Sequence, residues 1–453
     1  MTTTVLTRFG TDGIRGVAGE DVTAGLALSL GRIAVLRSSA EHPRIFVIRD
    51  TRESGEMLEC AIAAGAAEAG GEVLLGGVLP TPAAPLMVRR YGFDLGVVIS
   101  ASHNAYEDNG IKLFAADGFK LSDGDELEIE RLLDDPSSSA PCRGSSHAGG
   151  KPSAIGRIRQ LRGTREDYLR ELQLRFGDLS LAGVDVLLDC ANGATYNVAP
   201  EIFRRLGARV TVIGDLPDGR NINDGCGSTH VDVLATAVLA GGHDLGFAFD
   251  GDGDRLLAVD RAGQVVDGDE LLALSALHLR RRGRLPGNGV AVTVMTNFGF
   301  HTAMTEAGID VAVTDVGDRY VLDALRERGW ALGGEQSGHI IDLGFGPSGD
   351  GIAAALLALE ALAGDDLSAR AAMDKLPQLL TNVRVADRRA LEGAARVHAA
   401  IARESESLHG RGRVLVRPSG TEPLVRVMVE APSSGEASEI SGRLVALIEA
   451  ELA

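Results

Sequence analysis

A strand-helix-strand unit recurs three times along this chain and constrains its fold more than any other feature. Each unit has an apolar run, a polar turn, an Ala- or Leu-rich helical stretch, a glycine and a second apolar run. Strands this apolar, separated by helix-length sequence, are typical of parallel strands buried on both faces of a sheet. The sequence therefore predicts three similar mixed-sheet α/β domains, with strands at 44–49, 71–75, 184–188, 208–213, 290–295 and 309–313.

The pattern changes beyond Lys375. A strand-like run at 382–385, a helix over 389–408, paired apolar runs at 413–417 and 424–430 and a closing helix predict an α+β domain with antiparallel strands. The 453 residues exceed the roughly 250–300 at which a single core stops growing. We therefore expect four domains around a central cleft, at 1–155, 156–258, 259–372 and 373–453, with a Pro-, Ser- and Gly-rich linker over 134–154.

Bulk properties narrow the class of protein. A formal charge of −18 argues against nucleic acid as a partner, because that partner requires a broad basic face. The first ten residues lack the apolar core of a signal peptide, and the longest apolar run, Ile352–Leu359, is far shorter than a membrane span. A cytoplasmic protein without membrane contact is expected. The four cysteines are scattered and predict buried structural thiols in a reducing compartment.

The segment Asp250–Arg255 (Asp-Gly-Asp-Gly-Asp-Arg) follows an apolar run and carries three acids separated by glycines. Such spacing lets one loop wrap its carboxylates around a hard cation. A solvated acidic turn or an EF-hand loop would be the alternatives, but Arg255 and Ala262 stand where an EF-hand needs glycine and glutamate. We predict a metal site, with Mg²⁺ favoured over Ca²⁺ because a phosphate oxygen can complete the ligand set.

A second segment, Val97–Leu113, runs from a buried strand into a polar turn. A hydroxyl at the end of a strand faces the crevice where open α/β sheets bind ligands, so Ser100 and Ser102 are both candidate nucleophiles. Taken alone, serines in such a turn more often satisfy backbone groups. The residues by themselves do not choose between the two serines.

Three further segments carry polar groups. Gly333–His339 offers Glu, Ser and His side chains that can hydrogen-bond sugar hydroxyls. Arg417–Arg426 places two guanidiniums, two hydroxyls and a glycine between two strands, which favours a phosphate-binding turn over a plain hairpin. Phe9–Gly16 is glycine-rich with one arginine and would by itself be an N-terminal turn. Gly344–Gly349 fits a dinucleotide motif, but Pro347 has no N–H to offer, and no Walker A motif is present.

In this order, the five segments resemble the α-D-phosphohexomutase superfamily, and most closely its bacterial phosphoglucosamine mutases. The match spans essentially the whole chain, and Phe9–Gly16, Asp315–Val321 and Gly334–His339 look like the phosphoglucosamine mutase versions. The resemblance implies an intramolecular phosphotransferase that interconverts glucosamine 6-phosphate and glucosamine 1-phosphate through a 1,6-bisphosphate. It would supply precursors of UDP-N-acetylglucosamine and the cell wall.

The resemblance also implies roles for individual residues. Ser102 would carry the phosphoryl group and share one Mg²⁺ per chain with Asp250, Asp252 and Asp254, with a hexose 1,6-bisphosphate as primer. The substrate would be a phosphorylated amino sugar, and the chain a monomer or a homodimer. Groups near the transferred phosphoryl or in proton transfer would be Arg15, Lys112 and His339. Sugar contacts would come from Glu335, Ser337, His339 and Arg255, and phosphate contacts from Arg417, Ser419, Gly420, Thr421 and Arg426.

Two departures from the family pattern bear on specificity. Ala105 stands where the family usually has proline, which predicts a looser turn around Ser102. Residues 342–349 replace a more polar stretch near the sugar loop. The rival functions are a phosphoglucomutase or phosphomannomutase, a paralogue in specialised metabolism, a Mg²⁺-dependent sugar phosphatase and a catalytically silent sugar-phosphate sensor.

Overall fold

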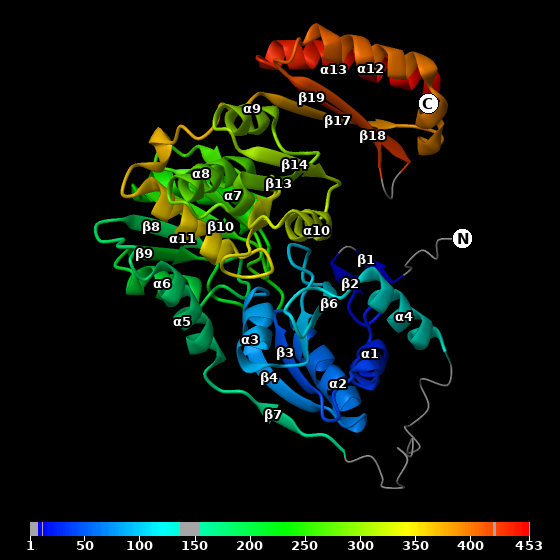
Figure 1. Ribbon diagram of the computed structural model, residues 1–453, viewed down its shortest axis with the longest axis vertical. Helices are drawn as coiled ribbons and strands as arrows, with labels where there is room; N and C mark the ends of the chain where they lie inside the picture. Colours follow the sequence, from blue (N-terminus) through cyan, green and yellow to red (C-terminus); the bar gives the residue numbers. More distant parts are fainter. Residues whose placement is uncertain (1–7, 11, 136–154, 420–422, 453) are drawn as a thin grey trace. The chain divides into compact units, whose positions relative to one another are not determined.

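The structure, a computed structural model, describes residues 8–10, 12–135, 155–419 and 423–452. The chain forms two compact units, one of residues 1–294 and 312–370 and one of residues 295–311 and 371–453. Figure 1 colours the chain from its N-terminus to its C-terminus and labels many of its helices and strands. The first unit contains mixed α/β sheets and the second an antiparallel sheet, which confirms the predicted fold class.

The first sheet has seven strands in the order β1-β2-β6-β5-β3-β4-β7. β3 pairs in parallel with β4 and β5, whereas β6 is antiparallel to β5 and β2, so the sheet is mixed. The strands are β1 (Phe9–Gly10), β2 (Gly13–Val17), β3 (Arg44–Arg49), β4 (Glu72–Val78), β5 (Leu95–Ile99), β6 (Asp108–Ala115) and β7 (Ile158–Gln160), and the helices are α1 (Ala24–Arg37), α2 (Gly55–Glu68), α3 (Ala83–Tyr91) and α4 (Asp123–Asp134).

The core of this sheet follows the two-residue strand period. Ile45 and Val47 of β3 and Val97 and Ile99 of β5 are buried in one cluster with α1, α2 and α4. Alternate residues, such as Phe46, point to the opposite face and are also buried. Both faces are therefore covered, as the continuous apolar runs predict.

The second sheet has five strands in the order β12-β11-β10-β8-β9. β8 pairs in parallel with β9 and β10, and β10 is antiparallel to β11, so the acidic loop 250–255 is the connection of a β10–β11 hairpin. The strands are β8 (Asp185–Asp189), β9 (Arg209–Ile213), β10 (Leu245–Phe249), β11 (Leu256–Asp260) and β12 (Val265–Val266), and the helices are α5 (Thr164–Phe176), α6 (Ala199–Arg205) and α7 (Val231–Gly241).

The third sheet has four strands in the order β14-β13-β15-β16. β13 and β15 are parallel, and the antiparallel β15–β16 hairpin carries the predicted sugar loop at its turn. The strands are β13 (Gly289–Thr293), β14 (Asp310–Thr314), β15 (Leu332–Gly334) and β16 (Ile340–Asp342), and the helices of the first unit that follow β12 are α8 (Gly268–Arg281), α10 (Asp318–Arg328) and α11 (Gly351–Leu362).

The second unit is built on a three-stranded antiparallel sheet with β19 in the middle. Segment 295–311 also belongs to it, because the Phe298 N–H donates to Glu430 at 3.0 Å and the Asn297 amide donates to the carbonyl of Leu376 at 3.0 Å. The elements are α9 (Phe298–Glu306), β17 (Gln378–Arg384), α12 (Ala395–Ser407), β18 (Arg413–Pro418), β19 (Leu424–Glu430) and α13 (Ser434–Leu452).

Several details differ from the sequence prediction. The helix expected over 389–408 is a 3₁₀ turn at Arg388–Gly393 followed by α12. Cys190 and Cys226 are buried, whereas the prediction is wrong for Cys60, which lies on the outward face of α2. Cys142 and most of the predicted linker lie outside the described residues.

The predicted domain boundaries stay predictions, as does the central cleft. β7 and β12 each pair with the sheet that precedes the expected boundary. Within the described residues, no helix combines the length and the apolar character needed to cross a bilayer.

Two glycines let α1 and α2 cross with their backbones in contact. A Cβ atom on Gly31 would lie 2.3 Å from the carbonyl oxygen of Ile62, and one on Gly65 would lie 1.9 Å from that of Leu28. Both distances are far shorter than a van der Waals contact, and neither backbone can yield without moving its helix. Close packing of these helices therefore depends on the absence of a side chain.

We predict that Gly65→Ala lowers the free energy of unfolding by about 1–3 kcal/mol, although alanine is the better helix former. Gly442 of α13 is the matched control, because a Cβ atom added there would have no other atom within 4 Å, and Gly442→Ala should stabilise by about 0.5–1 kcal/mol. Urea unfolding followed by circular dichroism measures both. Equal shifts of the same sign would contradict the packing argument.

Candidate active site

The serine turn follows β5 and gives its two serines different surroundings. Ser100 donates its hydroxyl to Asp50 at 2.6 Å and accepts the backbone N–H of Ser102 at 2.9 Å. The Ser102 hydroxyl instead donates a short hydrogen bond to Asp250 and lies 3.2 Å from the imidazole Nδ1 of His103. Ser100 is thus engaged in holding the turn, and the geometry favours Ser102 as the reacting hydroxyl.

The backbone of Ser102 lies in the left-handed region, with φ at +54°. A non-glycine residue keeps this conformation only where its surroundings fix it. The carbonyl of Ser102 accepts from the Arg52 guanidinium at 3.0 Å and from the Asn223 amide at 2.9 Å. Arg52 also donates to the carbonyls of Asn104 and Ala105, so this buried side chain holds the turn where proline is absent.

The acidic loop places Asp250, Asp252 and Asp254 with ligand oxygens within 4.8 Å of one another, all buried. Burial and then the charges of Asp254 and Asp252 raise the pKa of Asp250 well above its ordinary value. Among the described residues, the Oδ1 atoms of Asp252 and Asp254 have no hydrogen-bond partner. Buried carboxylate oxygens without donors fit a hard divalent cation, so these residues could hold one.

Lys112 supplies the nearest positive charge. Its ammonium lies 2.8 Å from Asp252 and 3.3 Å from Asp254. Burial lowers the pKa of Lys112, but the neighbouring charges of Asp12, Asp252 and Asp254 outweigh burial and leave it raised. Lys112 is therefore a fixed cation beside the acidic loop.

Three more basic side chains lie in or beside the acidic loop. Among the described residues, Arg15 Nε, Arg255 Nε and His339 Nε2 are buried nitrogens without a hydrogen-bond partner. Burial lowers the pKa of His339. The negative charges of Asp254, Asp318 and Glu335 raise it by more, so the pKa of His339 lies above its ordinary value. Orphaned donors beside orphaned acceptors fit a ligand that brings oxygen atoms together with a cation.

The predicted sugar loop lies against the acidic hairpin. Gly338 has φ at +89°, and a Cβ there would lie 1.8 Å from the carbonyl of Leu256, the first residue of β11. Glu335 is buried and accepts the N–H of Gly317 at 3.1 Å, whereas Ser337 is exposed. Gly349 makes room for His339, because a Cβ there would meet its ring at 2.5 Å. The stretch 342–349, which differs from the family pattern, thus contacts a predicted sugar-binding residue.

The predicted phosphate turn belongs to the second unit and joins β18 to β19. Arg417 and Arg426 are direct cross-strand partners, so two guanidiniums extend from neighbouring positions on one face. Arg388 donates to the carbonyl of Ser419 at 2.7 Å and adds a third guanidinium that the sequence did not single out. Gly420 and Thr421 lie outside the described residues.

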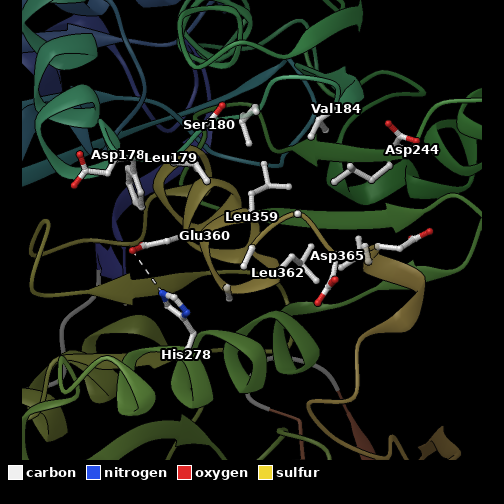
Figure 2. A pocket seen from close by; sticks show the side chains of 18 of the residues that line it. Asp178, Leu179, Ser180, Val184, Asp244, His278, Leu359, Glu360, Leu362 and Asp365 are labelled. Carbon is white, nitrogen blue, oxygen red and sulfur yellow. Dashed lines mark ion pairs between the residues drawn. The ribbon is translucent and has the colours of Figure 1, made fainter.

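A separate cavity lies elsewhere in the first unit. Its volume is about 1000 Å³, and it is lined by residues 178–184, by the end of α8 and by residues 359–367. Figure 2 shows some of these side chains. His278 lies 3.5 Å from Glu360, which also pairs with Arg175 and Arg284. No predicted site residue within the described ranges lines it, so this cavity is not part of the predicted active site.

Four blocks of the chain match the phosphoglucomutase/phosphomannomutase family: alpha/beta/alpha domain I over residues 6–139, domain II over 166–263, domain III over 267–380 and the C-terminal domain over 380–447. The chain belongs to this family.

Individual relatives agree. A phosphoglucosamine mutase from Desulforudis audaxviator is 50% identical over 447 residues, with 97% of each chain covered. A family protein from Burkholderia thailandensis has a similar structure, with a TM-score of 0.80, 23% identity and coverage of 99% and 98%. The N-acetylphosphoglucosamine mutase of Aspergillus fumigatus, in complex with GlcNAc-6P and magnesium, gives a TM-score of 0.71, 19% identity and coverage of 99% and 96%. The last two are likenesses of fold.

Sequence reasoning missed several residues that hold this candidate site together. Asp50 and Arg52 follow β3, Thr81 donates to Asp252 at 2.6 Å, and Asn223 lies in a loop after β9. Asp50 and Arg52 stand just beyond a buried strand, where polar residues face the carboxyl edge of a sheet, and that position could have singled them out. Thr81 and Asn223 carry no comparable signal.

We predict that Arg52→Met lowers kcat by about 100-fold, because the carbonyls of Ser102 and Asn104 keep only the Asn223 amide as a side-chain donor and the left-handed backbone relaxes. Steady-state kinetics and thermal unfolding measure the effect and its structural cost. Arg44→Met is the control, because Arg44 lies at the opposite end of β3 and is partly exposed. Equal activity of the two variants would refute the role assigned to Arg52.

Proposed function

We propose that this phosphohexomutase interconverts glucosamine 6-phosphate and glucosamine 1-phosphate, with Ser102 as the phosphoryl carrier. The observation that carries the proposal is the hydrogen bond from the Ser102 hydroxyl to Asp250. Asp250 is one of the three buried carboxylates of the acidic loop. Relatives named phosphoglucosamine mutase, about half identical over nearly their full length, support the choice of sugar.

The proposed reaction has two matched phosphoryl transfers. In the first, the bond between phosphorus and Ser102 Oγ breaks, a bond from phosphorus to the free sugar hydroxyl forms, that hydroxyl releases its proton and Ser102 Oγ takes up a proton. The resulting 1,6-bisphosphate turns over. In the second, the bond from the other phosphorus to its sugar oxygen breaks, Ser102 Oγ releases its proton as it takes this phosphoryl group, and the freed sugar oxygen gains a proton. Positive charge at Arg15 and Lys112 would balance charge on the transferring group, and His339 would lie beside the proton transfer.

Asp250, Asp252 and Asp254, with an oxygen on Ser102, are the residues that would hold Mg²⁺. The ion would neutralise charge on the phosphoryl oxygens. We also propose that Glu335, Ser337, His339 and Arg255 contact the sugar, and that Arg417, Ser419, Gly420, Thr421 and Arg426, together with Arg388, bind the phosphate that does not react.

We predict that Ser102→Ala abolishes turnover and the mass increase of about 80 Da that marks one phosphoryl group. Ser100→Ala is the matched control: it loses an anchor of the turn and some activity, but should still acquire the phosphoryl group from a hexose 1,6-bisphosphate. Intact mass spectrometry and turnover of glucosamine 6-phosphate with Mg²⁺ measure both. Phosphorylated, active Ser102→Ala enzyme would refute the assignment.

The same assay separates the rival functions. Glucose or mannose 6-phosphate turned over faster than glucosamine 6-phosphate would make the chain a phosphoglucomutase or phosphomannomutase. Release of inorganic phosphate without isomerisation would make it a phosphatase. Binding without either would indicate a sensor.

Metal binding has its own prediction. Saturating Mg²⁺ should stabilise the wild type, by about 2.7 kcal/mol at a hundred times its dissociation constant. Without metal, Asp250→Asn should be more stable than the wild type, because it removes a buried carboxylate repelled by Asp252 and Asp254. With Mg²⁺ this order should reverse. Thermal unfolding with Mg²⁺ and with EDTA tests this, and an unchanged midpoint on adding Mg²⁺ would contradict the site.

A further inference from the structure

A closed ring of alternating basic and acidic side chains includes two of the predicted catalytic groups, Lys112 and His339. Two of its ion pairs, from Lys120 to Asp12 and from Lys120 to Asp318, are short. The others measure 2.7 Å between Asp12 and Lys112, 3.3 Å between Lys112 and Asp254, 3.7 Å between Asp254 and His339, and 3.7 Å between His339 and Asp318. The charge ring thus consists of Lys120, Asp12, Lys112, Asp254, His339 and Asp318.

The ring joins three parts of the first unit. Asp12, Lys112 and Lys120 come from the first sheet and its connections, Asp254 comes from the acidic loop, and Asp318 and His339 come from the segments beside the third sheet. Its members are enclosed: the side chains of Lys120, Asp12 and Asp318 are only 12%, 17% and 15% exposed. Ion pairs this enclosed are weakly screened, so the loss of one member leaves its partners poorly compensated.

Lys120 differs from its cationic neighbours in what it contacts. It pairs with Asp12, whose other oxygen pairs with Lys112, and with Asp318, whose same oxygen pairs with His339. Its ion pairs within the described residues involve neither Ser102 nor the acidic loop. One ammonium therefore bridges two carboxylates. Asp12 also pairs with Lys112 and Arg15, and Asp318 also pairs with His339, so each carboxylate contacts different groups of the proposed reaction.

Asp318 also bears on the sugar loop. It is the first residue of α10, and the preceding Gly317 donates its N–H to Glu335 at 3.1 Å. A shift of Asp318 would move this donor as well as the partner of His339. Lys120 thus bears on two of the proposed sugar contacts.

We propose that Lys120 is a positioning residue of the mutase reaction: by holding Asp12 and Asp318 together, it places Lys112 and His339 on the two sides of the reacting group. This deepens the proposed function and rests on it. Lys120 transfers no proton and contacts no substrate. Its effect is exerted through the two carboxylates.

Arg319 provides a matched control. It joins the start of α10 to α4 through Glu126 at 2.7 Å and through Asp123, but its ion pairs in the described part of the chain include no member of the ring. Removing it loosens the same two segments of the first unit. A role in tethering alone would therefore make Lys120 and Arg319 equivalent.

The experiment compares Lys120→Met, Lys120→Arg and Arg319→Met in the full-length protein with Mg²⁺ and a hexose 1,6-bisphosphate. Lys120→Met should lower kcat by about 10–100-fold with a smaller change in KM, because both catalytic groups remain but are misplaced. Lys120→Arg, which restores the charge, should recover kcat to within about fivefold. Arg319→Met should stay within about threefold of the wild type.

Hydrogen exchange gives a readout that does not need turnover. Lys120→Met should speed amide exchange over residues 335–341, and Arg319→Met should leave that segment unchanged. Equal losses of kcat in Lys120→Met and Arg319→Met, failure of Lys120→Arg to recover, or unchanged exchange over 335–341 would each overturn the proposal.

The proposed function can fail independently of the role proposed for Lys120. If the wild type prefers another hexose phosphate, the three variants are compared on that sugar. If it turns over none, the proposed function fails and hydrogen exchange alone decides the role of Lys120.

Discussion

Three buried carboxylates within 4.8 Å of one another impose the constraint on which the rest of the site depends. Like charges this close in a poorly solvated environment repel strongly, and the raised pKa of Asp250 reflects that repulsion together with burial. Arg255 of the loop itself, together with Lys112 and His339 from two other parts of the chain, lies beside these carboxylates. Electrostatic balance thereby unites segments that share no sheet.

The same electrostatic balance explains how the site can still bind a ligand. Compensation is incomplete, because carboxylate oxygens on Asp252 and Asp254 and nitrogens on Arg15, Arg255 and His339 lack hydrogen-bond partners among the described residues. Acceptors and donors left open side by side match a metal ion accompanied by a phosphorylated ligand. If protein groups satisfied all of these donors and acceptors, the fold would be more stable, but no polar atom would remain to bind a substrate.

Sequence reasoning predicted the parts of this fold that follow local rules. Strand period and glycine-rich turns located β3, β8 and β13, and the spacing of aspartates located the acidic loop. The choice between Ser100 and Ser102 could not be made locally, because it depends on Asp50, far earlier in the chain, occupying one hydroxyl. Arg52 and Lys120 were missed for the same reason: their roles arise from carbonyls and carboxylates that only tertiary structure brings near.

The second unit is built from two separate segments of the chain, 295–311 and 371–453, and this affects its folding during synthesis on the ribosome. The groups that begin α9, Asn297 and the N–H of Phe298, bond to Leu376 and Glu430, which emerge much later. At about 5–20 residues per second, about 4–16 seconds pass before Leu376 is made and about 7–26 seconds before Glu430 is made. The start of α9 therefore does not have both partners until the last strand, β19, has been made.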